Sequence, residues 1–264
     1  MEIKDQLHRT LSISTTPKRI ISLVPSQTEL LFDLGLEDSI VGLTKFCVHP
    51  YHLKQTKKIV GGTKNIKIEK IKELNPDIIL CNKEENTKEI VALCEEVAPV
   101  HVSDIFTISD ALELIHQYGI LFSCRTDAQK IIQKIQFKLN DFQEYVKDIQ
   151  PQKVAYFIWR NPWMVAGNNT FINHLLSLNK FVNIYENKER YPEVELKKIR
   201  LEGDPDLVFL SSEPYPFKEE HAFEIGRCTH HAKTVYVDGE MFSWYGSRLM
   251  KAFDYFKKLH QRII

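Results

Sequence analysis

Cysteine is scarce in the 264-residue sequence, and the cysteines present are far apart. The five are Cys47, Cys81, Cys94, Cys124 and Cys228, and no two of them form a C-x-x-C pair. An odd number of widely spaced cysteines argues against a disulfide scaffold, and the missing pair argues against a zinc ribbon or a redox motif. We therefore expect a fold without disulfides.

The sequence also lacks an excess of charge and any long apolar run. Lysine plus arginine number 35 and aspartate plus glutamate number 35, so the formal net charge is zero. A dedicated nucleic-acid binder usually carries a basic excess, so we expect no nucleic-acid partner. No run of about 18 apolar residues is present, so we expect a soluble chain without membrane insertion.

The N-terminal residues 1–18 alternate charged and polar side chains. They lack the apolar stretch of about 7–15 residues that marks a secretory signal. As written, the chain is expected to be cytoplasmic. If the sequence is a mature form, a periplasmic or cell-surface location is expected instead.

Common catalytic motifs are missing. The sequence has no P-loop pattern, no G-x-G-x-x-G after its first strand, no G-x-S-x-G elbow and no H-E-x-x-H. The acidic pairs Glu84–Glu85 and Glu95–Glu96 have lysines nearby and are typical of solvated helix faces rather than acid–base dyads. We therefore expect a protein that is not an enzyme.

What the first half does contain is an alternation of strands and helices. The strands are predicted at 19–24, 40–43, 77–80 and 100–102, and the helices at 26–34, 68–74 and 87–97. Strands separated by helices indicate a mostly parallel sheet flanked by helices, which is an α/β fold.

A long amphipathic helix is predicted over about 126–149. From Ala128 onward the apolar residues recur at steps of three and four, and Pro151 prevents continuation. Such a helix can bridge two lobes, or it can lie on a single core as a bundle helix.

The second half repeats the first, and this favours the bridge. The run 17–24 returns in pattern at 151–158, and Asn75-Pro76-Asp77 returns as Asp204-Pro205-Asp206. The helix start at 28–31 returns loosely at 170–173, and the strand at 100–102 returns at 234–237. We therefore predict two similar α/β lobes, 1–123 and 151–264, bridged by residues 124–150.

Ligands of open parallel sheets bind beyond the carboxyl ends of the strands. Two loops at such positions contain all three tryptophans of the chain, together with arginine, glutamate and further aromatic residues. Aromatic faces beside a few polar groups are typical of a small-molecule site, although tryptophans can also fill space under a loop. The predicted ligand contacts are Trp159, Arg160, Trp163, Glu240, Phe242, Trp244 and Arg248, with Ser26, Phe46 and Tyr191 on the rim.

Metal-binding residue types occur in two short clusters. Cys47, His49 and His52 form one, and the adjacent pair His230 and His231 forms the other. Both patterns are more often incidental than metal-binding, so we predict neither a metal site nor an intrinsic cofactor.

The order of these motifs resembles the substrate-binding proteins of ABC importers for vitamin B12 and iron-siderophores, which have a helical backbone between two lobes. The resemblance runs from the Pro25-Ser26-Gln27-Thr28-Glu29 segment through the two Pro-Asp motifs to Ser243-Trp244-Tyr245-Gly246-Ser247-Arg248. It implies a corrinoid or metal chelate such as a ferric siderophore or haem, held in a cleft between the lobes with little hinge motion, and no catalysis.

The resemblance also implies docking on an ABC-importer permease through one acidic residue on each lobe. Glu69 stands at the first of these positions, whereas Lys197 occupies the second, with Glu195 as a substitute contact. We expect a monomer that binds its ligand and has weakened docking. The alternative is a cytoplasmic enzyme or chaperone on the same scaffold that acts on a tetrapyrrole-like or siderophore ligand.

Overall fold

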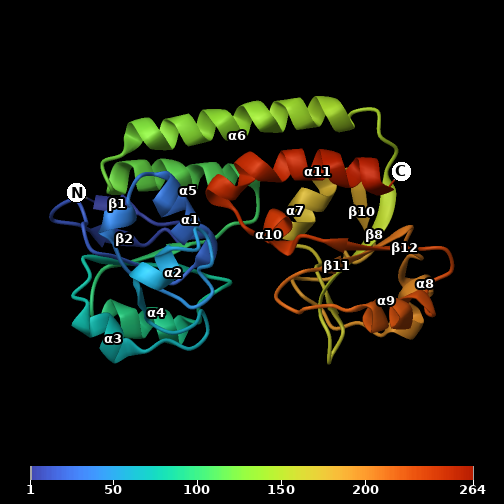
Figure 1. Cartoon of the computed structure of the whole chain (residues 1–264), viewed down its shortest axis with the longest axis horizontal. Coiled ribbons are helices and arrows are strands. Elements are labelled where there is room, and N and C mark those ends of the chain that lie inside the picture. Colours follow the sequence, from blue (N-terminus) through green and yellow to red (C-terminus); the bar gives the residue numbers. More distant parts are fainter. Residues whose placement is uncertain (1, 264) are drawn as a thin grey trace. The chain divides into compact units, whose positions relative to one another are not determined.

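A computed structural model describes residues 2–263 and divides them into two compact units (Figure 1). Unit 1 comprises the chain up to Gln136 together with Tyr245–Met250. Unit 2 comprises Phe137–Trp244 and the chain from Lys251 onward. The division therefore falls inside the long helix α6 (Arg125–Val146), and a short C-terminal segment returns to unit 1.

Unit 1 contains a five-stranded parallel sheet in the order β5-β4-β3-β6-β7. Its strands are β3 (Ile20–Ser22), β4 (Ile40–Leu43), β5 (Lys58–Ile59), β6 (Ile78–Asn82) and β7 (Val100–Ser103). Its helical elements are α1 (Pro25–Asp33), η1 (Glu37–Ser39), α2 (Leu53–Thr56), α3 (Ile68–Glu73), α4 (Lys88–Glu95), α5 (Ile108–Leu121) and η3 (Gly246–Arg248).

Unit 2 contains a second sheet in the order β10-β8-β11-β12, all parallel, with β9 antiparallel against β8. Its strands are β8 (Gln152–Trp159), β9 (Met164–Val165), β10 (Phe181–Asn183), β11 (Leu207–Ser211) and β12 (Lys233–Val237). Its helical elements are α7 (Phe171–Leu178), η2 (Leu196–Lys198), α8 (Ile199–Glu202), α9 (Glu219–Gly226) and α10 (Gly239–Ser243); helix α11 (Leu249–Ile263) begins in unit 1 and continues in unit 2.

The two sheets share one topology. The order β4-β3-β6-β7 of unit 1 recurs as β10-β8-β11-β12 in unit 2, with the same parallel pairing. The predicted α/β fold with two similar lobes is thus confirmed. The central strands β3, β6 and β11 are buried along their whole length, as expected where helices cover both faces of a parallel sheet.

The repeated Pro-Asp motif explains how each central strand begins. In unit 1, Asp77 Oδ2 accepts hydrogen bonds from the backbone N–H groups of Lys18 and Arg19, at 2.8 and 2.9 Å. In unit 2, Asp206 Oδ2 accepts from the Lys153 N–H at 2.7 Å. The aspartate backbone N–H groups return bonds to the carbonyls of Arg19 and Lys153. One residue type therefore sets the register between the first two central strands in both units.

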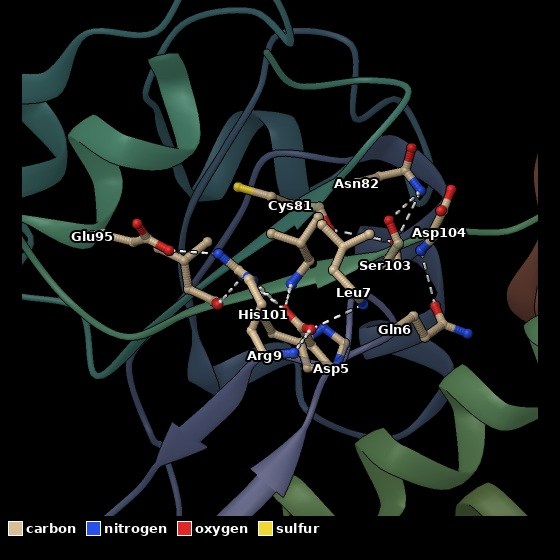
Figure 2. Close-up of polar contacts among 12 residues, drawn as sticks. Asp5, Gln6, Leu7, Arg9, Cys81, Asn82, Glu95, His101, Ser103 and Asp104 are labelled. Carbon is tan, nitrogen blue, oxygen red and sulfur yellow. Dashed lines mark hydrogen bonds and ion pairs between the residues drawn. The ribbon is translucent and has the colours of Figure 1, made fainter. Parts of the chain in front are cut away.

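Residues 2–12 form an antiparallel hairpin, β1 (Glu2–Lys4) and β2 (Thr10–Ser12), which the sequence did not predict. Its turn is held by the fully buried side chain of Asp5, which accepts hydrogen bonds from the N–H groups of Leu7, Arg9 and Val102 and from the Arg9 guanidinium (Figure 2). The same guanidinium bonds Glu95. The hairpin is thereby attached to β7 and α4.

Helix α6 confirms the predicted long helix and packs on α11 within unit 2. Phe142 of α6 is fully buried, with its ring centroid 5.6 Å from that of Phe253 and 5.8 Å from that of Phe256. Two ion pairs flank this contact, Lys138–Asp254 at 2.8 Å and Lys257–Asp141 at 2.7 Å. Among residues 2–263, no helix is both long and apolar enough to pass through a bilayer.

Candidate functional site

Aromatic rings follow the carboxyl ends of β8 and β11 in unit 2. Trp159, at the end of β8, is 39% exposed, and its ring meets Tyr215 edge-on at a centroid distance of 5.4 Å. Tyr215 lies 4.9 Å from Phe217, which stacks on Trp163 at 6.1 Å and an interplanar angle of 7°. We call Trp159, Trp163, Tyr215 and Phe217 the aromatic surface. It offers π-faces and edges at the strand ends where α/β sheets bind ligands.

Arg160 adds a positive charge beside the aromatic surface. Its guanidinium lies 5.2 Å from the centroid of the Trp163 ring and forms a 2.8 Å ion pair with Glu224. The hydrogen bond to Glu224 raises the pKa of Arg160, so the group is charged at every physiological pH. A planar cation held over an indole can pair with an anionic or carbonyl group of a ligand.

A half-buried carboxylate, that of Glu213, lies in the loop after β11, which also carries Tyr215 and Phe217. Glu213 Oε1 accepts hydrogen bonds from Ser243 Oγ at 2.8 Å and Trp244 Nε1 at 3.0 Å. Burial raises the pKa of the Glu213 carboxyl, and the two hydrogen bonds oppose this increase. Glu240, in the first turn of α10, adds a repulsive charge that raises the same pKa further. These contacts join the loop after β11 to the loop after β12.

The structure places the predicted aromatic contacts of the last loop inside the protein. Phe242 is fully buried and packs on Tyr156 at 5.2 Å and on Phe256 at 4.8 Å. Trp244 is 7% exposed. Its indole lies against the Glu213 carboxylate, where it positions the loop rather than widening the aromatic surface.

Tyr191 lies in the segment that runs beside β9. The backbone N–H of Val165 donates to the Pro192 carbonyl, and that of Val194 donates to the Trp163 carbonyl, so the chain around Tyr191 is held next to the Trp163 loop. The Tyr191 ring is half-buried, and the guanidinium of Arg190 lies 5.9 Å from its centroid. Trp159, Arg160, Trp163 and Tyr191 are thus carried by two adjoining segments of unit 2.

In unit 1, the corresponding strand ends are closed by a buried hydrogen-bond network. Gln27 Nε2 donates to Ser103 Oγ at 2.6 Å and to the Tyr245 hydroxyl at 3.1 Å, and the Tyr118 hydroxyl donates to Gln27 Oε1 at 2.7 Å. Figure 2 shows Asn82 reaching the same Ser103 from the end of β6. Burial raises the pKa of Tyr245, so its hydroxyl stays protonated.

Ser26 and Arg248 belong to this closed region. Ser26 is 4% exposed and hydrogen-bonds Tyr245. Arg248 is 5% exposed, and its Nε donates to Glu29 Oε2 at 2.8 Å in a buried ion pair. Gly246, between Tyr245 and Arg248 in the chain, has a φ of 86° and lies against Leu30, so the turn needs a residue that tolerates the left-handed region.

Phe46 is one of the exposed aromatic residues of unit 1. It follows β4, is 49% exposed and has Lys45 Nζ 4.9 Å from its ring centroid. The neighbouring residues of the Cys47, His49 and His52 pattern have other partners. The Cys47 thiol is buried within hydrogen-bonding distance of Thr28 and Thr44, and His52 pairs with Glu37 at 2.7 Å.

The sequence reasoning missed Tyr215, Phe217 and Glu213 in the loop after β11. The signal was available, because Ser212-Glu213-Pro214-Tyr215-Pro216-Phe217 follows a buried strand directly, as the tryptophan loops do. Gln27 was passed over for a different reason. Its partners Ser103, Tyr118 and Tyr245 are distant in sequence and only the fold brings them together.

Comparison with known families identifies the scaffold. A family model described as periplasmic binding protein matches residues 20–226. The chain belongs to this family.

Members of the periplasmic binding protein family resemble the chain over most of its length. An uncharacterised ABC transporter substrate-binding lipoprotein of Bacillus subtilis is 25% identical over 260 residues, covering 94% of this chain and 82% of the relative. A vitamin B12-binding protein of Vibrio cholerae is 26% identical over 196 residues, covering 74% and 70%. The crystal structure of the periplasmic vitamin B12 binding protein of Vibrio cholerae superposes with a TM-score of 0.80 at 22% identity, covering 94% of this chain and 98% of the other.

Proposed function

We propose that this periplasmic binding protein carries a corrinoid or another metal chelate for an ABC importer. The family match over residues 20–226 is the observation that carries the transport role. Because the family consists of binding proteins, the enzymatic alternative raised by the sequence is not favoured. The vitamin B12-binding relative supports a corrinoid as the first ligand to test.

The aromatic surface supports the same ligand class. Trp159, Trp163, Tyr215 and Phe217 form a chain of touching rings, and the macrocycle of a corrin or porphyrin offers a large apolar area that such rings can cover. Arg160 is placed to pair with a carboxylate, amide or phosphate group on the ligand periphery. Within unit 1, the exposed ring of Phe46 stays a proposed ligand contact, whereas Ser26 is buried.

The proposal is tested by titrating the purified protein with cyanocobalamin, cobinamide, haemin and a ferric hydroxamate siderophore, using calorimetry and thermal unfolding. We expect one of these ligands to bind with a stoichiometry of one and to raise the unfolding temperature, without turnover. A ligand at 100 times its dissociation constant stabilises the native state by about 2.7 kcal/mol.

A matched pair of variants locates the site. Trp159→Ala is expected to weaken binding, whereas Phe137→Ala, which removes a 70% exposed aromatic side chain from α6, is expected to leave it unchanged. Failure of all four ligands to bind would reject the ligand class. Equal binding by both variants would reject the aromatic surface as the site.

A further inference from the structure

The amino ends of β11 and β12 carry a second cluster of polar side chains. The residues directly before β11 include Asp204 and Asp206. Those shortly before β12 include His230 and His231. These positions lie at the strand ends opposite to the aromatic surface, which follows the carboxyl ends of β8 and β11. The cluster is therefore separate from the proposed ligand site within unit 2.

Three of these side chains have the geometry of a metal site. Asp204, His230 and His231 each offer one ligand atom, and the three atoms lie within 4.8 Å of one another. His231 Nδ1 is 3.9 Å from Asp204 Oδ2. Two ligands of a tetrahedral zinc ion, each about 2.0–2.1 Å from the metal, are about 3.4 Å apart. Small rotations of the exposed histidine side chains would bring the ligand atoms from 3.9 Å to the separation that zinc requires.

Asp206 orients His231 for metal binding. His231 Nε2 lies 3.1 Å from Asp206 Oδ1, and because a carboxylate only accepts, the imidazole proton must be on Nε2. In the neutral imidazole the lone pair is then on Nδ1, the atom that faces Asp204. Metal-binding histidines typically donate their second N–H to a carboxylate in this way. Asp206 is itself fixed by the Lys153 N–H.

Asp204 is held in place by its backbone. Its φ is 46°, its N–H donates to the Ile199 carbonyl at 3.1 Å, and the buried Pro205 follows it. Its Oδ1 atom is buried and, among the described residues, has no hydrogen-bond partner. The other carboxylate oxygen, Oδ2, is the one near His231, so a cation bound by both oxygens would also satisfy Oδ1, which is costly to leave without a partner.

We propose that Asp204, His230 and His231 bind a divalent first-row transition metal ion, with Zn²⁺ the best match. Two imidazoles and one carboxylate suit zinc, and the exposure of both histidines leaves a coordination position to water. The ion would join the entries of the neighbouring strands β11 and β12. This inference is independent of the proposed transport ligand.

The test uses the full-length protein after treatment with a chelator and its removal. Calorimetric titration with Zn²⁺ is expected to show one site per chain. Thermal unfolding is expected to show a higher unfolding temperature with Zn²⁺ than without it. Two variants should each weaken this binding at least tenfold: His230→Ala/His231→Ala, and Asp204→Asn. Asparagine tolerates a positive φ, so Asp204→Asn keeps the backbone turn.

The control variant is His52→Ala. It removes the histidine of another exposed histidine–carboxylate pair, His52–Glu37, which has only two metal-binding side chains instead of three. It is expected to keep the zinc affinity and stoichiometry of the native protein. Absorption of bound Co²⁺ gives a second measurement, since a site with nitrogen and oxygen ligands has visible d–d bands that both cluster variants should lose. The proposal is overturned if the native protein binds no Zn²⁺ at about 100 μM, a concentration about ten times a dissociation constant of 10 μM. It is also overturned if the two cluster variants bind Zn²⁺ as tightly as the native protein does.

Discussion

Exposure separates the aromatic side chains of unit 2 into two groups with different roles. Trp159 is 39% exposed and Phe242 is fully buried, although both were predicted as ligand contacts. We expect Trp159→Ala to weaken ligand binding about 2- to 10-fold, because an aromatic contact contributes about 0.5–1.5 kcal/mol beyond area burial. Its free energy of unfolding without ligand should change by less than about 1 kcal/mol.

Phe242→Ala should have the opposite effects, a large loss of stability and little change in ligand affinity. Removing a buried phenylalanine from contact with Tyr156 and Phe256 is expected to lower the free energy of unfolding by about 3–5 kcal/mol. Urea denaturation and ligand titration of both variants measure the two effects. Unchanged stability of Phe242→Ala, with lost affinity, would show that this ring contacts ligand after all.

Burial also makes His101 a source of acid sensitivity. Desolvation lowers its pKa below the ordinary value of 6.5; Arg9 adds to this, while the hydrogen bond with Gln117 and the charge of Asp5 oppose it. The unfolded state therefore binds a proton more readily than the native state, and stability falls as the pH drops below about 6.5. Above that pH the contribution of His101 is complete and constant.

We expect His101→Gln to reduce the loss of unfolding free energy between pH 7.5 and pH 5.5. Each pH unit between the unfolded and native pKa values costs up to about 1.4 kcal/mol, and glutamine does not titrate. Urea unfolding at a series of pH values provides the measurement. His260 also has a pKa lowered by burial, so the informative quantity is the difference between native protein and variant. An identical pH dependence in both would exclude His101 as the source.

At the scale of elements, the contact of α6 with α11 depends on packing more than on charge. We expect Phe142→Ala to lower the free energy of unfolding by about 3–5 kcal/mol, because it leaves a cavity beside Phe253 and Phe256. Lys138→Ala should cost at most about 1 kcal/mol, since its partner Asp254 is half exposed and water screens the pair. Thermal unfolding of both variants tests this ranking. A larger loss for Lys138→Ala would mean that the ion pairs, not the rings, hold the two helices together.

The elements that the sequence predicted well are those with a strong local pattern. The buried strands β3, β6 and β11 appear as apolar runs, and α6 appears as a repeat of apolar residues at steps of three and four. The hairpin β1–β2 was missed because each strand has only three residues, and its position depends on Asp5 reaching the backbone of Val102. No local pattern reports a contact across 97 residues.

The candidate site was only partly predictable for a related reason. Residue type and loop position led to Trp159, Arg160 and Trp163, which the structure places on or beside the aromatic surface. The same signals led to Phe242 and Arg248, which are buried against Tyr156 and Glu29. The sequence pattern of an aromatic or charged loop residue is the same whether its side chain faces solvent or packs against another segment of the chain.

At the scale of the whole molecule, transport requires a permease as partner, and the family resemblance predicts that the chain docks on it through the positions of Glu69 and Lys197. The Glu69 side chain, on α3, is 76% exposed, and Lys197 lies exposed in η2. We expect Lys197→Glu to strengthen association with a vitamin B12-type importer in nanodiscs about tenfold, which corresponds to about 1.4 kcal/mol. Affinity for the transported ligand should not change, because Lys197 lies outside the aromatic surface.

Lys197→Gln separates the loss of a positive charge from the gain of a negative one, and it should show a smaller increase. Glu69→Lys is expected to weaken the association. Surface plasmon resonance at several salt concentrations measures each affinity, and the differences should shrink as salt rises. Tight binding by the native protein that Lys197→Glu abolishes would instead mean that the importer presents an acidic surface to Lys197.

Unit 1 does not complete its core until the ribosome has made almost the whole chain. Tyr245 and Arg248, which satisfy Gln27 and Glu29 of α1, are synthesised about 110 residues after Gln136. At about 5–20 residues per second, the N-terminal part of unit 1, once complete at Gln136, waits roughly 5–20 s for these partners. During this interval Gln27 and Glu29 of α1 lack these two partners, which should lower the stability of unit 1. The two units should therefore become native almost together, although the first was made well before the second.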